Sequence, residues 1–162
     1  MDMKIIDLKK TILEDNDKDA ELLRKETRAG RVCYLNVMSS PGSGKTSTIL
    51  ALLHAIGARI SCGVMEADID SDVDAKTIYE AGYPSVQLHT GGMCHLDAQM
   101  SRQGMKALYE AAESMGRKKP ELVILENVGN LVCPAEFDTG SDLNLVVLSV
   151  PEGDDKPLKY PL

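Results

Sequence analysis

Aromatic and basic residues are both scarce in this sequence. There is no Trp, one Phe and five Tyr among the 162 residues, so a core must be built from aliphatic side chains and Met. Asp and Glu outnumber Lys and Arg by 25 to 18, which leaves a formal net charge of -7. Nucleic-acid binding needs clustered cations, and single-strand binding also needs aromatic rings on which bases stack. The composition therefore argues against nucleic acid as the main partner.

Long apolar runs and export patterns are also missing. No stretch approaches the roughly 18–20 apolar residues of a membrane-spanning helix, and the sequence opens with no signal-peptide pattern. We therefore expect no membrane partner and a cytoplasmic location. The four cysteines lie far apart, and a disulfide framework is not expected in a reducing compartment. Each Cys is then a core thiol or a metal ligand.

The alternation of apolar and helical segments predicts an α/β fold, with a mainly parallel sheet and helices on both faces. Residues 1–30 are highly charged, with apolar residues at helical spacing. They predict an N-terminal amphipathic helical segment, either continuous or broken near Asn16. Residues 31–162 predict one P-loop domain. Its strands are expected at 32–38, 60–66, 85–89, 122–125 and 143–150, and its helices at 45–56, up to 81, and at 95–115.

Residues 39–46, Ser-Ser-Pro-Gly-Ser-Gly-Lys-Thr, form a phosphate-loop motif between a predicted strand and a predicted helix. Ser39 stands where the first Gly is usual, which is tolerated if its backbone conformation is ordinary. Backbone N–H groups and the Lys45 ammonium are expected to hold phosphates, and the Thr46 hydroxyl is expected to bind Mg²⁺. The residues predicted to contact nucleotide in this loop are Gly42, Ser43, Gly44, Lys45, Thr46 and Ser47.

Two carboxylates at later strand ends are candidate partners of Mg²⁺. Asp68 follows the second predicted strand and Glu126 the fourth, and Mg²⁺ takes oxygen ligands while keeping several waters. Glu126 and Gly129 also have the spacing of a switch in which a Gly amide senses the γ-phosphate. Other acidic residues near Asp68 are expected to be solvated: Asp70, Asp72 and Asp74. No catalytic base stands out, and the predicted catalytic groups are Lys45, Thr46 and Glu126.

A second candidate site contains sulfur and imidazole donors. Cys94 and His95 follow the third predicted strand, and Cys133 follows the fourth, so the carboxyl ends of parallel strands can bring them together. Two thiolates and an imidazole suit Ni²⁺, Zn²⁺ or copper rather than Mg²⁺. A water or a second set of donors across a two-fold axis would complete the coordination, whereas the alternative is that these Cys are small buried apolar residues. Core packing is expected for Cys33 and Cys62, and surface or supporting positions for His54 and His89.

Five segments together resemble the HypB-type hydrogenase nickel-incorporation GTPases, from about residue 10 onward. They are the loop at 39–46, Glu-Ala-Asp at 66–68, Gly-Gly-Met-Cys-His-Leu at 91–96, and the longer runs at 126–138 and 150–161. The resemblance implies a P-loop GTPase of the signal-recognition/partitioning class that uses GTP, Mg²⁺ and Ni²⁺ or Zn²⁺. It also implies a nucleotide-promoted homodimer that works with an accessory nickel metallochaperone and a hydrogenase large-subunit precursor. In this resemblance, Asp68 belongs to the first switch, Gly129 to the second, and the Cys94, His95 and Cys133 metal site lies at the dimer interface.

Three features of the family pattern are missing from these 162 residues: a Cys-rich nickel motif near the N-terminus, a His-rich tract, and an Asn-Lys-x-Asp guanine-reading motif. In the family the guanine-reading motif comes soon after the Lys-Tyr-Pro segment at which this sequence stops, so we expect a C-terminal truncation. GTP rather than ATP is therefore implied by the resemblance alone. Three alternatives stay open: a urease-type nickel-insertion GTPase, a metal carrier with a non-functional nucleotide site, and an ATP-dependent phosphotransferase or partitioning ATPase.

Overall fold

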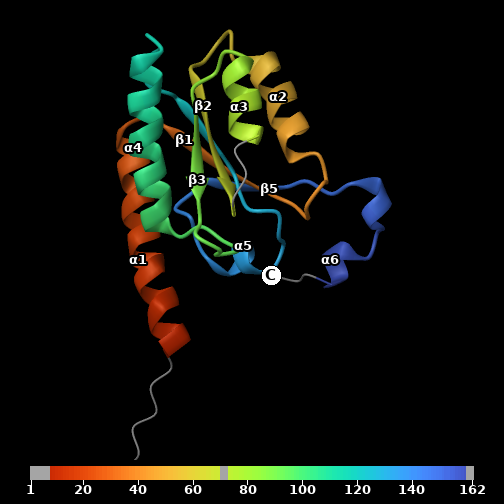
Figure 1. Ribbon diagram of the computed structural model, residues 1–162. Helices are drawn as coiled ribbons and strands as arrows, with labels where there is room; N and C mark the ends of the chain where they lie inside the picture. The colour runs from red at the N-terminus through yellow and green to blue at the C-terminus, as the bar shows by residue number, and fades with distance from the viewer. Residues whose placement is uncertain (1–7, 70–72, 160–162) are drawn as a thin grey trace, which may run out of the picture.

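The computed structural model describes residues 8–69 and 73–159, and it has strands and helices in alternation (Figure 1). The strands are β1 (Cys33–Met38), β2 (Cys62–Asp68), β3 (Ser85–His89), β4 (Leu122–Glu126) and β5 (Leu143–Val146). The helices are α1 (Leu8–Ala29), α2 (Lys45–Ile56), α3 (Val73–Glu80), α4 (Ala98–Ser114), α5 (Cys133–Glu136), the 3₁₀ turn η1 (Val150–Glu152) and α6 (Lys156–Lys159). The predicted α/β class is confirmed.

The five strands form one parallel sheet in the order β3-β2-β4-β1-β5. The register places Glu126 of β4 beside Glu66 of β2 on one side and Val37 of β1 on the other. The carboxyl ends of these three central strands therefore meet at one edge. Ligands bind at such an edge in open α/β sheets, which makes it the place to look for a site.

Helices cover both faces of the sheet, as predicted. Successive strand residues point to opposite faces, so Val64 packs in one apolar cluster and the next residue, Met65, in the other. The Met65 cluster includes Leu23 of α1 and Leu108 of α4, whereas the Val64 cluster includes Ile49 of α2. In Figure 1, α1 and α4 accordingly lie together on one side of the sheet, and α2 and α3 on the other.

The N-terminal segment contains one helix that runs through Asn16 without a break over residues 8–29. Its buried residues Ala20 and Leu23 face the core, and Arg102 on α4 forms an ion pair with Glu26. Gly30 follows the end of this helix, as its position in the sequence predicts. None of the helices in residues 8–69 and 73–159 is long and apolar enough to cross a bilayer.

Several predicted boundaries differ from those of the structure. β2 starts and ends two residues later than 60–66, so Asp68 is its last residue rather than a loop residue. α4 begins at Ala98 rather than 95, because the Asp97 carboxylate accepts a hydrogen bond from the Met100 N–H at 2.8 Å and caps the helix. β5 stops at Val146, opposite the last residue of β1, and the chain then forms η1.

The core assignment of Cys33 is also wrong, although that of Cys62 is confirmed. Cys33 is the first residue of β1 and is exposed. The neighbouring edge strand β5 begins only opposite Leu35, so its ladder does not extend to the Cys33 position. The apolar run at 32–38 predicts that Cys33 lies in a strand, but it does not predict whether a neighbouring segment buries the side chain.

Candidate functional site

The phosphate-loop segment has the backbone of an anion-binding loop. Gly42 and Gly44 have φ values of 74° and 92°, and a Cβ on either would meet nothing within 4 Å. Gly44 is the N-cap of α2 and provides no side-chain hydrogen bond to the helix amides. The first N–H groups of α2 are therefore available to an anion, and the helix dipole favours negative charge there.

Lys45 is positioned within this loop by Ser39. Lys45 is 9% exposed, and its ammonium donates to Ser39 Oγ at 3.1 Å. Among the described residues, the one non-glycine with positive φ is Arg31, so Ser39 has the ordinary backbone conformation that the sequence analysis required. The Ser39 hydroxyl thus positions the Lys45 side chain. The glycine that is usual at this position has no side chain that could accept this hydrogen bond.

The loop opens onto a cavity of about 590 Å³ at the carboxyl ends of β2 and β4. This volume is within the range of small-molecule sites. Every residue predicted to contact nucleotide or Mg²⁺ lines it: Gly42, Ser43, Gly44, Lys45, Thr46, Ser47, Asp68, Glu126 and Gly129. Residues that are up to 87 positions apart in the chain therefore share one cavity.

Three carboxylates meet inside this cavity. Glu66, Asp74 and Glu126 each offer an oxygen within 4.8 Å of the others. Glu66 is 2% exposed and Glu126 is 5% exposed, and Thr46 Oγ1 donates to Glu126 Oε1 at 2.9 Å. Glu66 Oε1 and Glu126 Oε2 have no hydrogen-bond partner. Orphaned carboxylate oxygens beside a phosphate loop are the donors that Mg²⁺ prefers, so the residues fit this ion.

The same cluster perturbs protonation. Burial, together with the neighbouring Glu126 carboxylate, raises the pKa of Glu66 to about 11. Burial also raises the pKa of Glu126, which the hydrogen bonds from Glu66 and Thr46 oppose. Two adjacent buried carboxyl groups cannot both ionise without a compensating cation, so the ligand-free pair retains a proton on Glu66.

Glu66→Gln is expected to flatten the pH dependence of stability. In wild type the folded state binds the Glu66 proton up to a pKa of about 11, against 4.5 for the ordinary group. Between these values the folded state holds more protons than the unfolded state, so the free energy of unfolding falls as pH rises, by at most about 1.4 kcal/mol per pH unit. Urea unfolding at about pH 5 and about pH 8 should show a smaller fall for Glu66→Gln than for wild type. Glu113→Gln, at an exposed position of α4, is the control. If the free energy of unfolding of Glu66→Gln falls with pH as much as that of wild type, the raised pKa assigned to Glu66 is wrong.

Sequence reasoning missed Glu66 and misplaced Asp74. Glu66 lies inside the buried strand β2, and its available signal was a lone acid within an apolar run. Asp74 was expected to be solvated, but it is half-buried in the first turn of α3 and faces the cluster. Asp70 and Asp72 lie outside the described residues.

A carboxylate from beyond β5 also reaches the phosphate loop. Glu152 accepts hydrogen bonds from Ser43 Oγ at 3.0 Å and from the Ser149 N–H at 2.7 Å. A hydrogen bond from the Ser40 hydroxyl, together with those from Ser149 and Ser43, lowers the pKa of Glu152 to about 2. Ser149 and Glu152 form a capping box, which is a signal that the sequence does contain. The turn after β5 is thereby fixed against the loop.

The predicted sulfur and imidazole donors lie at the same edge of the sheet. Cys94 is in the loop between β3 and α4, and Cys133 begins α5; a hydrogen bond between the two thiols is the main cause that raises the pKa of Cys133. The His95 ring stacks on Phe137, with centroids 3.7 Å apart and planes 12° apart. His95 Nδ1 is buried without a hydrogen-bond partner, and burial lowers the pKa of the imidazole. His95 is therefore neutral and has a free donor atom, as a metal ligand requires.

Within one chain, Cys94, His95 and Cys133 do not come close enough together to bind one ion. Within residues 8–69 and 73–159, the trio of His, Cys, Asp or Glu donors that lies within 4.8 Å is Glu66, Asp74 and Glu126. Cys94 and Cys133 approach each other, whereas His95 does not join them at that distance. His54 and His89 are exposed, in keeping with the expected surface positions.

Comparison with known proteins gives concordant matches. The family described as "CobW/HypB/UreG, nucleotide-binding domain" matches residues 33–149. The hydrogenase maturation factor HypB of Rhizobium leguminosarum bv. viciae is 44% identical over 158 residues, which cover 98% of this chain and 50% of that protein. The hydrogenase/urease maturation factor HypB of Helicobacter pylori (strain ATCC 700392 / 26695) is 42% identical over 162 residues, or 99% of this chain and 63% of that protein. The chain thus spans about half to two thirds of the length of these curated relatives.

Two solved structures share the fold. HypB from Helicobacter pylori in complex with nickel superposes with a TM-score of 0.81 at 39% identity, over 91% of this chain and 66% of that one. HypB from Archaeoglobus fulgidus superposes with a TM-score of 0.75 at 34% identity, over 92% of this chain and 69% of that one.

Proposed function

Because the chain belongs to the CobW/HypB/UreG family of nucleotide-binding domains, we propose that it is the nucleotide-binding part of a HypB-type GTPase that inserts nickel into a hydrogenase precursor. The observation that carries the proposal is the single cavity at the ends of β2 and β4. It combines a phosphate loop, a buried lysine and orphaned carboxylates.

The residues of the cavity have separate tasks in GTP binding. The amides of residues 42–47 and the Lys45 ammonium hold the phosphates, because both present positive charge at the start of α2. Mg²⁺ supplies further charge neutralisation at the transferred phosphoryl group. Its protein ligands come from a set at the cavity floor: Thr46, Glu66, Asp68, Asp74 and Glu126. Hydrolysis is slow, since Lys45 and the loop amides stabilise charge and we assign no general base among residues 8–69 and 73–159.

Gly129 is suited to sense the γ-phosphate. A Cβ at this position would lie 3.1 Å from Pro41 Cα, so the glycine backbone packs directly against the phosphate loop. Asn127, two residues earlier, is buried and donates to Asn36 on β1 at 3.1 Å. The strand end is therefore anchored while the glycine contacts the loop, which supports a second switch at residues 126–129.

Nickel is the proposed cargo, bound by Cys94, His95 and Cys133. Support comes from the thiol pair, from the unpartnered His95 Nδ1, and from the nickel-bound HypB of Helicobacter pylori that shares the fold. Zn²⁺ suits the same donors. Since the three donors do not converge in one chain, we assign the complete site to a homodimer promoted by nucleotide.

The names of the relatives indicate the enzyme that receives the metal. Rhizobium HypB is a hydrogenase maturation factor, and Helicobacter HypB is a hydrogenase/urease maturation factor. We therefore propose a hydrogenase large-subunit precursor as the recipient and an accessory nickel metallochaperone as the second partner. Urease is the alternative recipient.

GTP turnover with Mg²⁺ tests the proposed activity. Wild type should release phosphate from GTP slowly, and Thr46→Ala should lower the rate at least about tenfold because the hydroxyl on the metal side is lost. Thr48→Ala is the matched control: Thr48 lies on the same helix, and its hydroxyl donates to Gly44 O instead. Wild-type turnover no faster than that of Thr46→Ala would contradict the GTPase and favour the metal carrier.

A further inference from the structure

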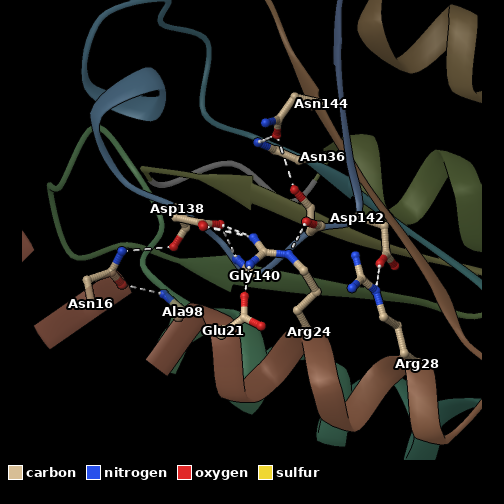
Figure 2. Close-up of polar contacts among 11 residues, drawn as sticks. Asn16, Glu21, Arg24, Arg28, Asn36, Ala98, Asp138, Gly140, Asp142 and Asn144 are labelled. Atoms are coloured by element: carbon tan, nitrogen blue, oxygen red, sulfur yellow. Dashed lines mark hydrogen bonds and ion pairs between the residues drawn. The ribbon is translucent and has the colours of Figure 1, made fainter. Parts of the chain in front are cut away.

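One side chain of α1 bridges the two segments that carry the proposed nickel ligands (Figure 2). Asn16 is 8% exposed. Its Nδ2 donates to Asp138 O at 2.9 Å, and its Oδ1 accepts from the Ala98 N–H at 2.9 Å. The amide thus joins positions 82 and 122 residues away in the chain.

Both partners of Asn16 are close in sequence to proposed ligands. Ala98 is the first residue of α4, three residues after His95. Asp138 comes directly after Phe137, the residue whose ring stacks on His95. A shift at either end of the Asn16 amide therefore moves a ligand-bearing segment.

Arg24, two turns further along α1, strengthens one side of this arrangement. It donates to both carboxylate oxygens of Asp138 at 2.8 Å and to Ser141 O at 3.0 Å. Arg24 also donates a hydrogen bond to the Glu21 carboxylate on its own helix. Figure 2 shows that Arg24 faces the 138–142 segment, whereas Asn16 reaches both this segment and the start of α4.

We propose that Asn16 is a positioning residue for the nickel site, which fixes the segment of Cys94 and His95 relative to the segment of Cys133. This inference rests on the proposed metal site. An amide fits because it must accept from one backbone group and donate to another. A carboxylate could accept from the Ala98 N–H but could not donate to Asp138 O. An alanine would leave the buried Ala98 N–H and the partly buried Asp138 O without this partner.

Ni²⁺ competition titrations of Asn16→Asp and Asn16→Ala test the inference, at temperatures where circular dichroism shows full folding. Outer-shell substitutions typically weaken metal binding 10- to 100-fold, so a loss of about tenfold or more is expected, together with a shifted thiolate-to-nickel absorption band. Arg28→Ala is the matched control. It removes another contact between α1 and the core, the Arg28–Asp142 ion pair at 2.9 Å, but leaves both hydrogen bonds of Asn16 in place. It should retain Ni²⁺ affinity within about twofold.

The outcomes separate the inference from the proposed function. If Asn16 variants bind Ni²⁺ as tightly as Arg28→Ala while Cys94→Ala binds weakly, the positioning role is refuted and the metal site stands. If Cys94→Ala also binds like wild type, both are refuted. Should the Asn16 variants not fold, amide exchange in wild type decides: Ni²⁺ should slow exchange at Ala98, and an unchanged rate would refute the role.

Discussion

Replacing Lys45 with methionine is expected to lower nucleotide affinity about a hundredfold, or ~2.7 kcal/mol. Among the described residues that line the cavity, Lys45 is the one cation, and it shares the cavity with four carboxylates. Without the Lys45 charge, the carboxylates of the cavity would repel the phosphates, and only the backbone dipoles of the loop would offset this repulsion. Methionine keeps most of the apolar stem, so packing of this buried side chain changes little.

Titration with GTPγS in the presence of Mg²⁺ measures this effect. Lys76→Met is the control, because it removes the same charge from an exposed position of α3. If Lys45→Met binds the nucleotide as tightly as Lys76→Met does, the cavity is not the phosphate site.

Removing either thiol of the proposed nickel site should lower Ni²⁺ affinity at least about a hundredfold. Cys94 and Cys133 interact with each other, so in the proposed site both would supply thiolates to the same ion, and the loss of either would leave too few soft donors. Affinity should also fall as pH falls, because protons compete with the metal and the pKa of Cys133 is already raised.

The chain provides two matched controls for the thiol substitutions. Cys33→Ala alters an exposed thiol and Cys62→Ala a buried one, and neither residue lies in the loops at the carboxyl end of the sheet. Both variants should retain Ni²⁺ affinity in a competition assay with a chromogenic chelator. Equal losses at all four positions would show that the metal binds elsewhere or non-specifically.

Local sequence was sufficient to predict the elements that depend on local chemistry. α2 begins at Lys45 and ends at Ile56, and β3 covers Ser85–His89, as the phosphate-loop motif and the flanking Gly and Pro indicate. The phosphate loop was predictable for the same reason: its glycines, lysine and hydroxyls are consecutive. Parallel-strand geometry then placed Asp68, Glu126 and Gly129 at the same edge.

What could not be predicted depends on approach between distant segments. Burial of Glu66 follows from its neighbours β3 and β4, which no pattern within β2 reveals. Cys33 resembled a core residue because the short extent of β5 is not visible in β1. Asn16 appeared as a possible helix break, yet its amide is satisfied by two backbone groups far along the chain, which allows a polar residue to be buried in a continuous helix.

Isothermal titration of the 162-residue chain with GTPγS, with and without Mg²⁺, tests the central claim most directly. The cavity predicts one nucleotide per chain and at least about tenfold tighter binding when Mg²⁺ is present, since the ion would satisfy the orphaned oxygens of Glu66 and Glu126. Absence of binding, or an affinity that Mg²⁺ does not change, would contradict a magnesium-dependent nucleotide site at the ends of β2 and β4.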